Sequence, residues 1–151
     1  MRGIIGYGTH VPYHRLQRSA VSEVFGGAPG KGTRAVASYD EDTTSMGVEA
    51  GRRALRDAPD VRPDAVWFAT SAPAYLDKTN ATAIHAALRL DTDADALDMA
   101  GAVRSGVGAL RVALRSDEPT LVVSSDIRTG LPTSADEAGG GATARRPARG
   151  R

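Results

Sequence analysis

The chain has 151 residues, which is long enough for one domain with its own hydrophobic core. Hydrophobic residues make up 41% of it and charged residues 25%, the composition of an ordinary globular protein. The net charge of +1 gives no electrostatic ground for binding nucleic acid or a membrane, and the absence of cysteine excludes disulfides, thiolate metal sites and thiol catalysis.

The chain is predicted to begin with a strand and a short helix. Residues 3–7 (GIIGY) are apolar and end at Gly8 and Pro12, so we interpret them as a first buried strand. Residues 18–25 (RSAVSEVF) have the pattern of a short helix. The glycine and proline residues of 26–32 (GGAPGKG) favour a loop.

The clearest helix pattern lies within residues 38–59. Three side chains can cap its first turn: Asp42, Thr43 and Thr44. Its apolar face repeats at four-residue spacing: Met46, Ala50 and Ala54. The acidic run at residues 40–42 suits the positive end of the helix dipole, which explains these carboxylates without a general acid–base role.

Strand and helix patterns alternate over the following residues. Strands are predicted at 65–70, 96–99 and 120–126, and helices at 79–90 and 103–116. The first of these strands, AVWFAT, is apolar throughout, as in a strand covered on both faces. The second helix carries an apolar stripe: Val107, Leu110 and Leu114. Helices between strands predict an α/β protein with a mostly parallel sheet and helices packed on it.

The composition changes near residue 130. We therefore expect a folded unit over residues 1–130 and a separate tail over residues 131–151. The tail is rich in Gly, Ala and Arg, with almost no large apolar residue after Leu131, which predicts a disordered or aberrant segment.

Nothing in the sequence predicts export or membrane insertion. The first residues lack the apolar run of a signal peptide. No stretch approaches the about 20 apolar residues of a membrane span. We expect a cytoplasmic protein.

Two groups of residues partly match a cofactor-binding or metal-binding motif, but neither group completes the motif. Gly6 and Gly8 give part of a dinucleotide-binding fingerprint, but Val11 stands where the third glycine is needed. His10 and His14 have the spacing of ligands on one helix face, but Pro12 lies between them and no third ligand is near. We interpret both histidines as loop residues at or near the surface and expect no metal.

The loop at 26–32 offers a basic contact for a ligand. Lys31 and Arg34 stand among glycines, but Lys31 precedes Gly32, so the spacing is not that of a P-loop. A solvated loop is the simpler interpretation. As an alternative, Lys31 and Arg34 bind a phosphate-bearing ligand.

Five stretches together resemble the hydroxymethylglutaryl-CoA synthases, a family of the thiolase superfamily that is related to ketoacyl-ACP synthase III. The resemblance covers nearly the whole chain up to about Ala144. The stretches, in chain order, are RGIIGYGTHVPYHRL, VASYDEDTTSMGVEAGRRAL, AVWFATSAPAYLDKTNATAIHAAL, DMAGAVRSGVGAL and LVVSSDIRTGLPTSADEAGGGATA.

The resemblance implies the first half of a thiolase-like fold, in which two similar α/β halves enclose an active site for acyl-CoA. It also implies two family residues that this chain lacks. The nucleophilic cysteine of the family falls on Val103, which cannot form a thioester. The general acid–base glutamate falls near Ser71, which cannot take that role.

Neighbouring residues give weaker candidates for binding a substrate. Ser105 lies in a strand–turn–helix junction but needs a base within reach, so a small residue for close helix packing is the simpler interpretation. Arg104 stands at a helix start, where a cation is poorly placed for the dipole, which favours a ligand or partner role. We therefore expect substrate contacts at Arg104 and Ser105 and no catalytic residue in this chain.

Three hypotheses follow. The chain is an acyl-CoA-handling protein of the acyltransferase type that has lost the cysteine, with a coenzyme A thioester as its ligand and no other cofactor. Alternatively, it is a non-catalytic subunit that forms a homodimer or pairs with a thiolase-fold or OB-fold protein. Finally, it is a fragment that does not fold alone: the last residues, ARRPARGR, depart from the family pattern, which suggests a truncated or frame-shifted end.

Overall fold

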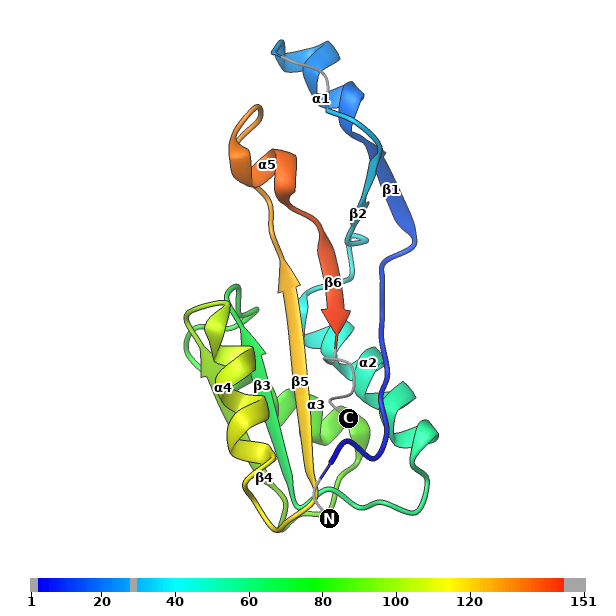
Figure 1. Cartoon of the computed structure of the whole chain (residues 1–151), viewed down its shortest axis with the longest axis vertical. Helices are drawn as coiled ribbons and strands as arrows, with labels where there is room; N and C mark the ends of the chain where they lie inside the picture. The colour runs from blue at the N-terminus through cyan, green and yellow to red at the C-terminus, as the bar shows by residue number, and fades with distance from the viewer. Residues whose placement is uncertain (1–2, 28–29, 146–151) are drawn as a thin grey trace.

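The computed structural model describes residues 3–27 and 30–145. Its centre is a four-stranded sheet in the order β4–β3–β5–β6 (Figure 1). The strands are β3 (Ala65–Thr70), β4 (Asp95–Ala100), β5 (Thr120–Ile127) and β6 (Ala142–Arg145). The first three strands are parallel to one another and β6 runs antiparallel to β5. The predicted α/β class and mostly parallel sheet are therefore confirmed.

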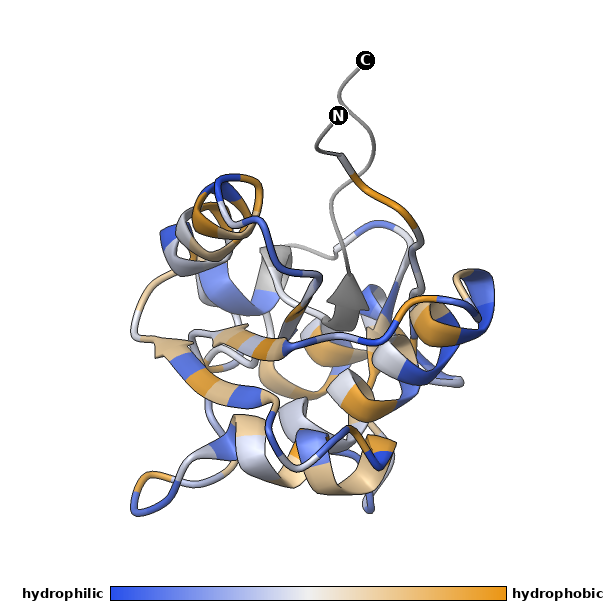
Figure 2. Ribbon diagram, turned by 90° about the horizontal axis from the view of Figure 1, so that it is seen from below, coloured by the Kyte–Doolittle hydropathy of each residue, from blue (hydrophilic) through white to orange (hydrophobic). Residues whose placement is uncertain are grey.

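Helices cover both faces of this sheet (Figure 2). Helices α2 (Thr43–Asp57) and α3 (Asn80–Leu88) pack on one face, and α4 (Arg104–Ala113) packs on the other. Strand β3 contributes to the packing on both faces of the sheet, because its successive side chains point to opposite faces. Val66 and Phe68 point toward α2 and α3, whereas Trp67 and Ala69 contact the α4 side. The prediction that this strand is covered on both faces is confirmed.

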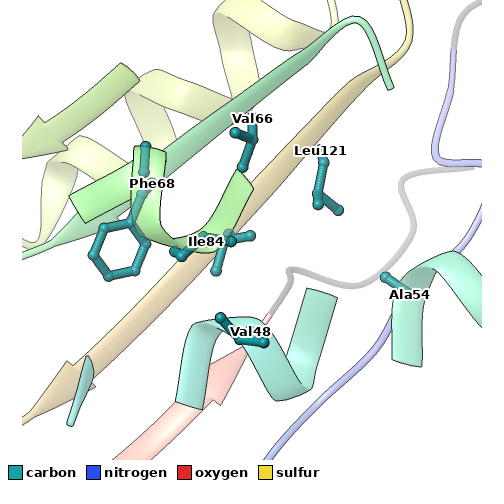
Figure 3. Packing of buried hydrophobic residues seen from close by; sticks show 8 residues of the cluster. Val48, Ala54, Val66, Phe68, Ile84 and Leu121 are labelled. Atoms are coloured by element: carbon teal, nitrogen blue, oxygen red, sulfur yellow. The ribbon is translucent and has the colours of Figure 1, made fainter. Parts of the chain in front are cut away.

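The largest core cluster lies between the sheet and the helices α2 and α3 (Figure 3). Phe68, Ile84 and Val66 are fully buried in it. Gly47 of α2 approaches this core so closely that a Cβ there would lie 3.1 Å from Val123 and 3.2 Å from Ile84. Small residues on α2 thus allow the helix to lie directly on the sheet.

The helix α2 begins as its sequence predicts. Of the three candidate caps, Asp42 is the one used: its side chain accepts a hydrogen bond from Ser45 N at 2.6 Å. The Ser45 hydroxyl in turn accepts one from Asp42 N at 2.8 Å, which completes a capping box.

The predicted strand at residues 3–7 is wrong, because this segment lies along α2 without pairing to any described strand. Its glycines explain the difference. A Cβ on Gly6 would lie 2.8 Å from Ala58 Cβ, and one on Gly8 would collide with backbone atoms of α2. Tyr7 N also donates to the Asp57 carboxylate at 3.0 Å. The glycines therefore serve a close approach to a helix.

Two strands that the sequence did not reveal form a separate antiparallel pair, β1 (His14–Gln17) and β2 (Thr33–Val36). The helix α1 (Arg18–Phe25), which was predicted, lies between them in sequence and buries no residue. Together β1, α1 and β2 form an arm that extends beyond the carboxyl ends of the main sheet (Figure 1). Polar and charged residues at His14, Arg15 and Gln17 explain why apolar patterning missed the first strand.

The apolar stripe of α4 is only partly covered, because Leu110 is half-buried whereas Val107 and Leu114 are exposed. Ala109 is the buried residue of this helix and Ala113 packs beside it. Val107 and Leu114 of the stripe are 61% and 40% exposed. One apolar side of the helix is thus left uncovered in this chain.

Part of the expected tail has regular structure. Residues 131–145 include α5 (Ala135–Gly139) and the strand β6, which is hydrogen-bonded to β5. This differs from the disorder expected there. The glycine-rich composition gives no local strand pattern, because β6 forms through its pairing with the distant strand β5. The rest of the tail, residues 146–151, lies outside the described residues, and the division of the chain at residue 130 stays a prediction.

Among the described residues, no helix combines the length and the apolar character needed to cross a membrane.

Candidate functional site

The candidate site lies at the carboxyl edge of the sheet, where the three parallel strands end at Thr70, Ala100 and Ile127. Ligands of open α/β sheets bind at this edge, because the connecting loops there are free to carry binding residues. The loops that follow β3 and β4 meet at this edge. Gly101 N donates to Thr70 O at 3.2 Å, so the position after β3 and the turn after β4 are adjacent.

The turn between β4 and α4 presents Val103. Gly101, with φ of +111°, reverses the chain after the strand in a conformation that a side chain would disfavour. Val103 then precedes the first residue of α4, and its side chain is 65% exposed. The expected nucleophile position is therefore accessible, but it carries an alkyl group that has no acid, base or nucleophilic function.

Ser71 lies at the end of β3 and contacts a carboxylate that the sequence interpretation missed. Asp126, in β5, accepts three hydrogen bonds on its Oδ1 atom: from Ser71 N at 2.7 Å, from Ser71 Oγ at 2.8 Å and from Thr70 Oγ1 at 3.2 Å. Position 71 thus lacks a carboxylate of its own but has one beside it.

A second carboxylate near this edge is used entirely for structure. Asp98 Oδ1 accepts from Ala81 N at 2.7 Å, and its Oδ2 accepts from Asn80 N at 2.7 Å and Asn80 Nδ2 at 3.0 Å. These bonds cap the first turn of α3 from the neighbouring strand. The amide of Asn80 also holds the loop after β3, donating to Tyr75 O at 2.9 Å.

The two candidate substrate contacts on α4 lie at this edge. Arg104 is exposed at the first position of the helix. Ser105 is half-buried, and its hydroxyl donates to Ala100 O at 3.5 Å. That partner is a carbonyl oxygen, and no side chain of residues 3–27 and 30–145 acts as a base toward the Ser105 hydroxyl. A ligand role for either residue stays a prediction.

The other two candidates belong to the arm, since Arg34 is in β2 and Lys31 is in the loop before it. The arm lies away from α4 (Figure 1). Lys31 is exposed in the loop before β2. Arg34 is largely buried: its Nη1 lies 3.2 Å from Glu137 Oε1 and donates to Glu137 O at 3.0 Å. The Arg34 charge is therefore already opposed by a carboxylate, and of this pair Lys31 is the side chain open to a ligand.

Of the two histidines expected in a loop at or near the surface, His10 is half-buried and His14 is exposed but belongs to a strand. His10 is only 15% exposed, and its Nε2 lies 2.7 Å from Glu41 Oε1. Glu41 Oε2 also accepts from Ser38 N at 2.7 Å. Glu41 therefore does not lie in the first turn of α2, where it would interact with the helix dipole; it connects the N-terminal segment to the loop before the helix. His14 is exposed in β1.

No group of three or more metal-ligating side chains gathers within residues 3–27 and 30–145. An apolar cavity of about 220 Å³ lies at the opposite, amino edge of the sheet, between the N-terminal segment and the ends of α2 and α4. It contains none of the polar groups of the carboxyl edge, so the two features are separate.

Comparison with known sequences finds hydroxymethylglutaryl-CoA synthases. The synthase of Pyrococcus furiosus is 32% identical over 139 residues, which cover 86% of this chain and 39% of that protein. The synthase of Methanosphaera stadtmanae is 33% identical over 150 residues, covering 93% of this chain and 42% of that protein. The chain thus spans about two fifths of the length of these curated relatives. No protein-family model matches it.

Solved structures of the same kind share the fold. A hydroxymethylglutaryl-CoA synthase complexed with CoA superposes with a TM-score of 0.82 at 23% identity, over 96% of this chain and 41% of that one. 3-Oxoacyl-[acyl-carrier-protein] synthase III from Aquifex aeolicus gives a TM-score of 0.77 at 21% identity, over 96% and 53% of the two chains. The chain has part of a thiolase-like fold, and the expected resemblance to these synthases is confirmed.

Proposed function

We propose that this hydroxymethylglutaryl-CoA synthase-like chain binds an acyl-CoA thioester at the carboxyl edge of its sheet and handles it without forming a cysteine thioester. The resemblance to synthases supports the ligand class, since two of the solved neighbours hold CoA or 3-hydroxy-3-methylglutaryl coenzyme A. The single observation that carries the second part is Val103, exposed at the turn after β4 in a chain without cysteine.

The chemistry that fits such a site needs no covalent acyl-enzyme. Decarboxylation and retro-aldol cleavage of an acyl-CoA proceed through charge on a carbonyl oxygen, which a shaped pocket with hydrogen-bond donors stabilises. Such a step belongs to the assembled protein, because the site lies on one half of a thiolase-like fold. Arg104, exposed at the entrance to α4, is the side chain proposed to meet a ligand carboxylate or phosphate.

Restoring a thiol at the turn tests this proposal. The chain has no cysteine, so Val103→Cys carries a single thiol, and Val107→Cys, on the exposed side of the same helix, is its matched control. The start of a helix lowers the pKa of a thiol, whereas its middle does not. We expect the thiol introduced at position 103 to react with iodoacetamide about tenfold faster than the one at position 107. We also expect only the former to take an acetyl group from acetyl-CoA.

The proposal is contradicted by equal reactivity of the two thiols with no acyl transfer to either, because position 103 would then not face an acyl-CoA site. Wild-type protein provides the blank in both assays, since it has no thiol to modify.

A non-catalytic role in a complex is the second candidate, and the uncovered surfaces favour it. Strand β4 is the outer strand of the sheet, with no further described strand on its free side and with Leu97 exposed. The exposed stripe of α4 adds a second apolar surface. A homodimer, or a heteromer with a thiolase-fold or OB-fold protein, would cover these surfaces, and self-association without any acyl-CoA binding in solution would favour this candidate over the first.

A further inference from the structure

Two arginines of the arm and one carboxylate of α5 form a cluster that we call the clasp: Arg18, Arg34 and Glu137. Arg34 Nη1 lies 3.2 Å from Glu137 Oε1 and donates to Glu137 O at 3.0 Å. Arg18 donates from Nη1 to Glu137 O at 3.5 Å and from Nη2 to Gly140 O at 3.4 Å. The carbonyls at the end of a helix lack intrahelical partners and favour cations, so the clasp fastens the arm to the end of α5.

The charges of the clasp are buried, although much of the arm is not. The side chains of Arg34 and Glu137 are only 13% and 11% exposed. Glu137 Oε1 makes no hydrogen bond with any residue of 3–27 and 30–145, so the Arg34 charge is what compensates this oxygen for the loss of water. The helix α1 of the arm, by contrast, buries no residue. Because burying an ion pair costs free energy, the pair points to a need for one fixed position of the arm.

The two arginines of the clasp also hold the loop that carries Lys31. Arg18 N donates to Gly32 O at 3.0 Å, and a Cβ on Gly30 would lie 2.7 Å from Arg18 Cβ. Gly32, with φ of +74°, leads the chain into β2, which contains Arg34. Lys31 therefore lies between two residues that are both bound to α5, and it is itself exposed.

A second ion pair of α5 has none of these properties. Arg128 Nη2 lies 3.0 Å from Asp136 Oδ1, and the two side chains are 52% and 69% exposed. A pair so open to water adds little to stability. It joins α5 to the residue after β5 and not to the arm, so the position of Lys31 does not depend on it.

We propose that Glu137, through Arg18 and Arg34, positions Lys31 to bind the phosphate groups of a ligand whose other end lies at the carboxyl edge of the sheet. The arm extends beyond this edge (Figure 1). The inference rests on the proposed function, because coenzyme A carries its phosphates at the end of the molecule opposite to the thioester. Glu137 is a positioning residue: it does not touch the ligand and acts through Lys31, the cation left open once Arg34 is paired.

Calorimetric titration of the full chain measures this positioning. The probes are CoA and adenosine 3′,5′-bisphosphate, which resembles the phosphate-bearing end of CoA. Lys31→Met should weaken the binding of both probes about tenfold, the loss of one charged contact. Glu137→Gln, which removes the charge that holds the arginines, should weaken both by a similar factor. The double variant should bind no more weakly than either single variant, because the two residues act in one contact.

Three further variants separate positioning from a general loss of structure. Asp136→Asn breaks the exposed pair of the same helix and should bind both probes like the wild type. Arg34→Glu combined with Glu137→Arg exchanges the buried charges and should recover part of the binding that Glu137→Gln loses. Arg18→Met leaves the buried pair intact and should weaken both probes about threefold. Circular dichroism identifies any variant that does not fold, and Arg18→Met then decides the case in place of Glu137→Gln.

The outcomes distinguish this inference from the proposed function. Wild-type binding by Lys31→Met or by Glu137→Gln overturns the positioning role while CoA remains the ligand, and so do losses that add in the double variant. If both probes follow the expected pattern but CoA binds no more tightly than the bisphosphate, the acyl-CoA ligand is contradicted and the clasp stands. Absence of binding by either probe overturns both proposals.

Discussion

Glu41 is expected to make the stability of this protein depend on pH in the acid range. Its partial burial raises the pKa of its carboxyl, but hydrogen bonds from Ser38 N and from the His10 side chain lower it more, and the pKa lies below its ordinary value of 4.5. A pKa lowered by folding means that Glu41 stabilises the folded state above about pH 4.5 and that this contribution is lost as the pH falls below that value.

Glu41→Gln should therefore weaken the dependence of stability on pH in the acid range. At pH 7 the variant should unfold more easily than the wild type by about 1 kcal/mol, the value of one hydrogen bond. The two proteins should converge as the pH falls below 4.5, because the wild-type carboxyl takes up a proton there. Urea titrations at a series of pH values measure this, with the exposed neighbour in Asp40→Asn as the control. Parallel curves for wild type and Glu41→Gln would contradict it.

At the scale of elements, α3 depends on a strand that lies next to it. Thr79, the residue before the helix, makes no side-chain cap, and Asp98 of β4 supplies the carboxylate instead. Asp98→Ala would leave two backbone N–H groups without a partner at the buried start of α3. We expect a loss of about 2–3 kcal/mol in the free energy of unfolding. Chemical denaturation should show little change for Asp95→Ala, an exposed residue of the same strand; equal losses would contradict the capping role.

The elements that depend on local patterns could be predicted from the sequence. The continuous apolar run at 65–70 and the four-residue spacing of Met46, Ala50 and Ala54 predict β3 and α2, because helix and strand periodicities are local. Residues 3–7 show the limit. Their apolar, glycine-spaced pattern suits a strand as well as an extended segment pressed on a helix, and only the position of α2 decides between the two.

The candidate site could be predicted only in part. The turn at Val103 follows from small residues between a strand and a helix. The contacts of Ser71 with Asp126 and of Arg34 with Glu137 join residues 55 and 103 positions apart in the chain. No local pattern encodes such pairs, since they form only when β3, β5 and α5 are in place. Asp126 was missed, and the rule that parallel strands carry ligand-binding residues at their carboxyl ends is the one sequence signal from which it could have been found.

For the molecule as a whole, the two faces of the sheet are unequally covered. In the part of the chain that the structure describes, helices α2 and α3 enclose the larger core on one side of the sheet, whereas α4 packs on the other side and turns Val107 and Leu114 outward. The carboxyl edge, with Val103, Ser71 and Asp126, is nevertheless assembled from residues of this chain alone.

Native mass spectrometry of the wild-type chain with acetyl-CoA tests the central claim most directly, because one spectrum reports both binding and covalent transfer. We predict a complex of one acetyl-CoA per chain that is present under native conditions and disappears on denaturation, leaving protein of unmodified mass. If no complex forms even when acetyl-CoA is in large excess over the protein, the proposed acyl-CoA site is contradicted. An acetyl adduct that survives denaturation would contradict chemistry without an acyl-enzyme.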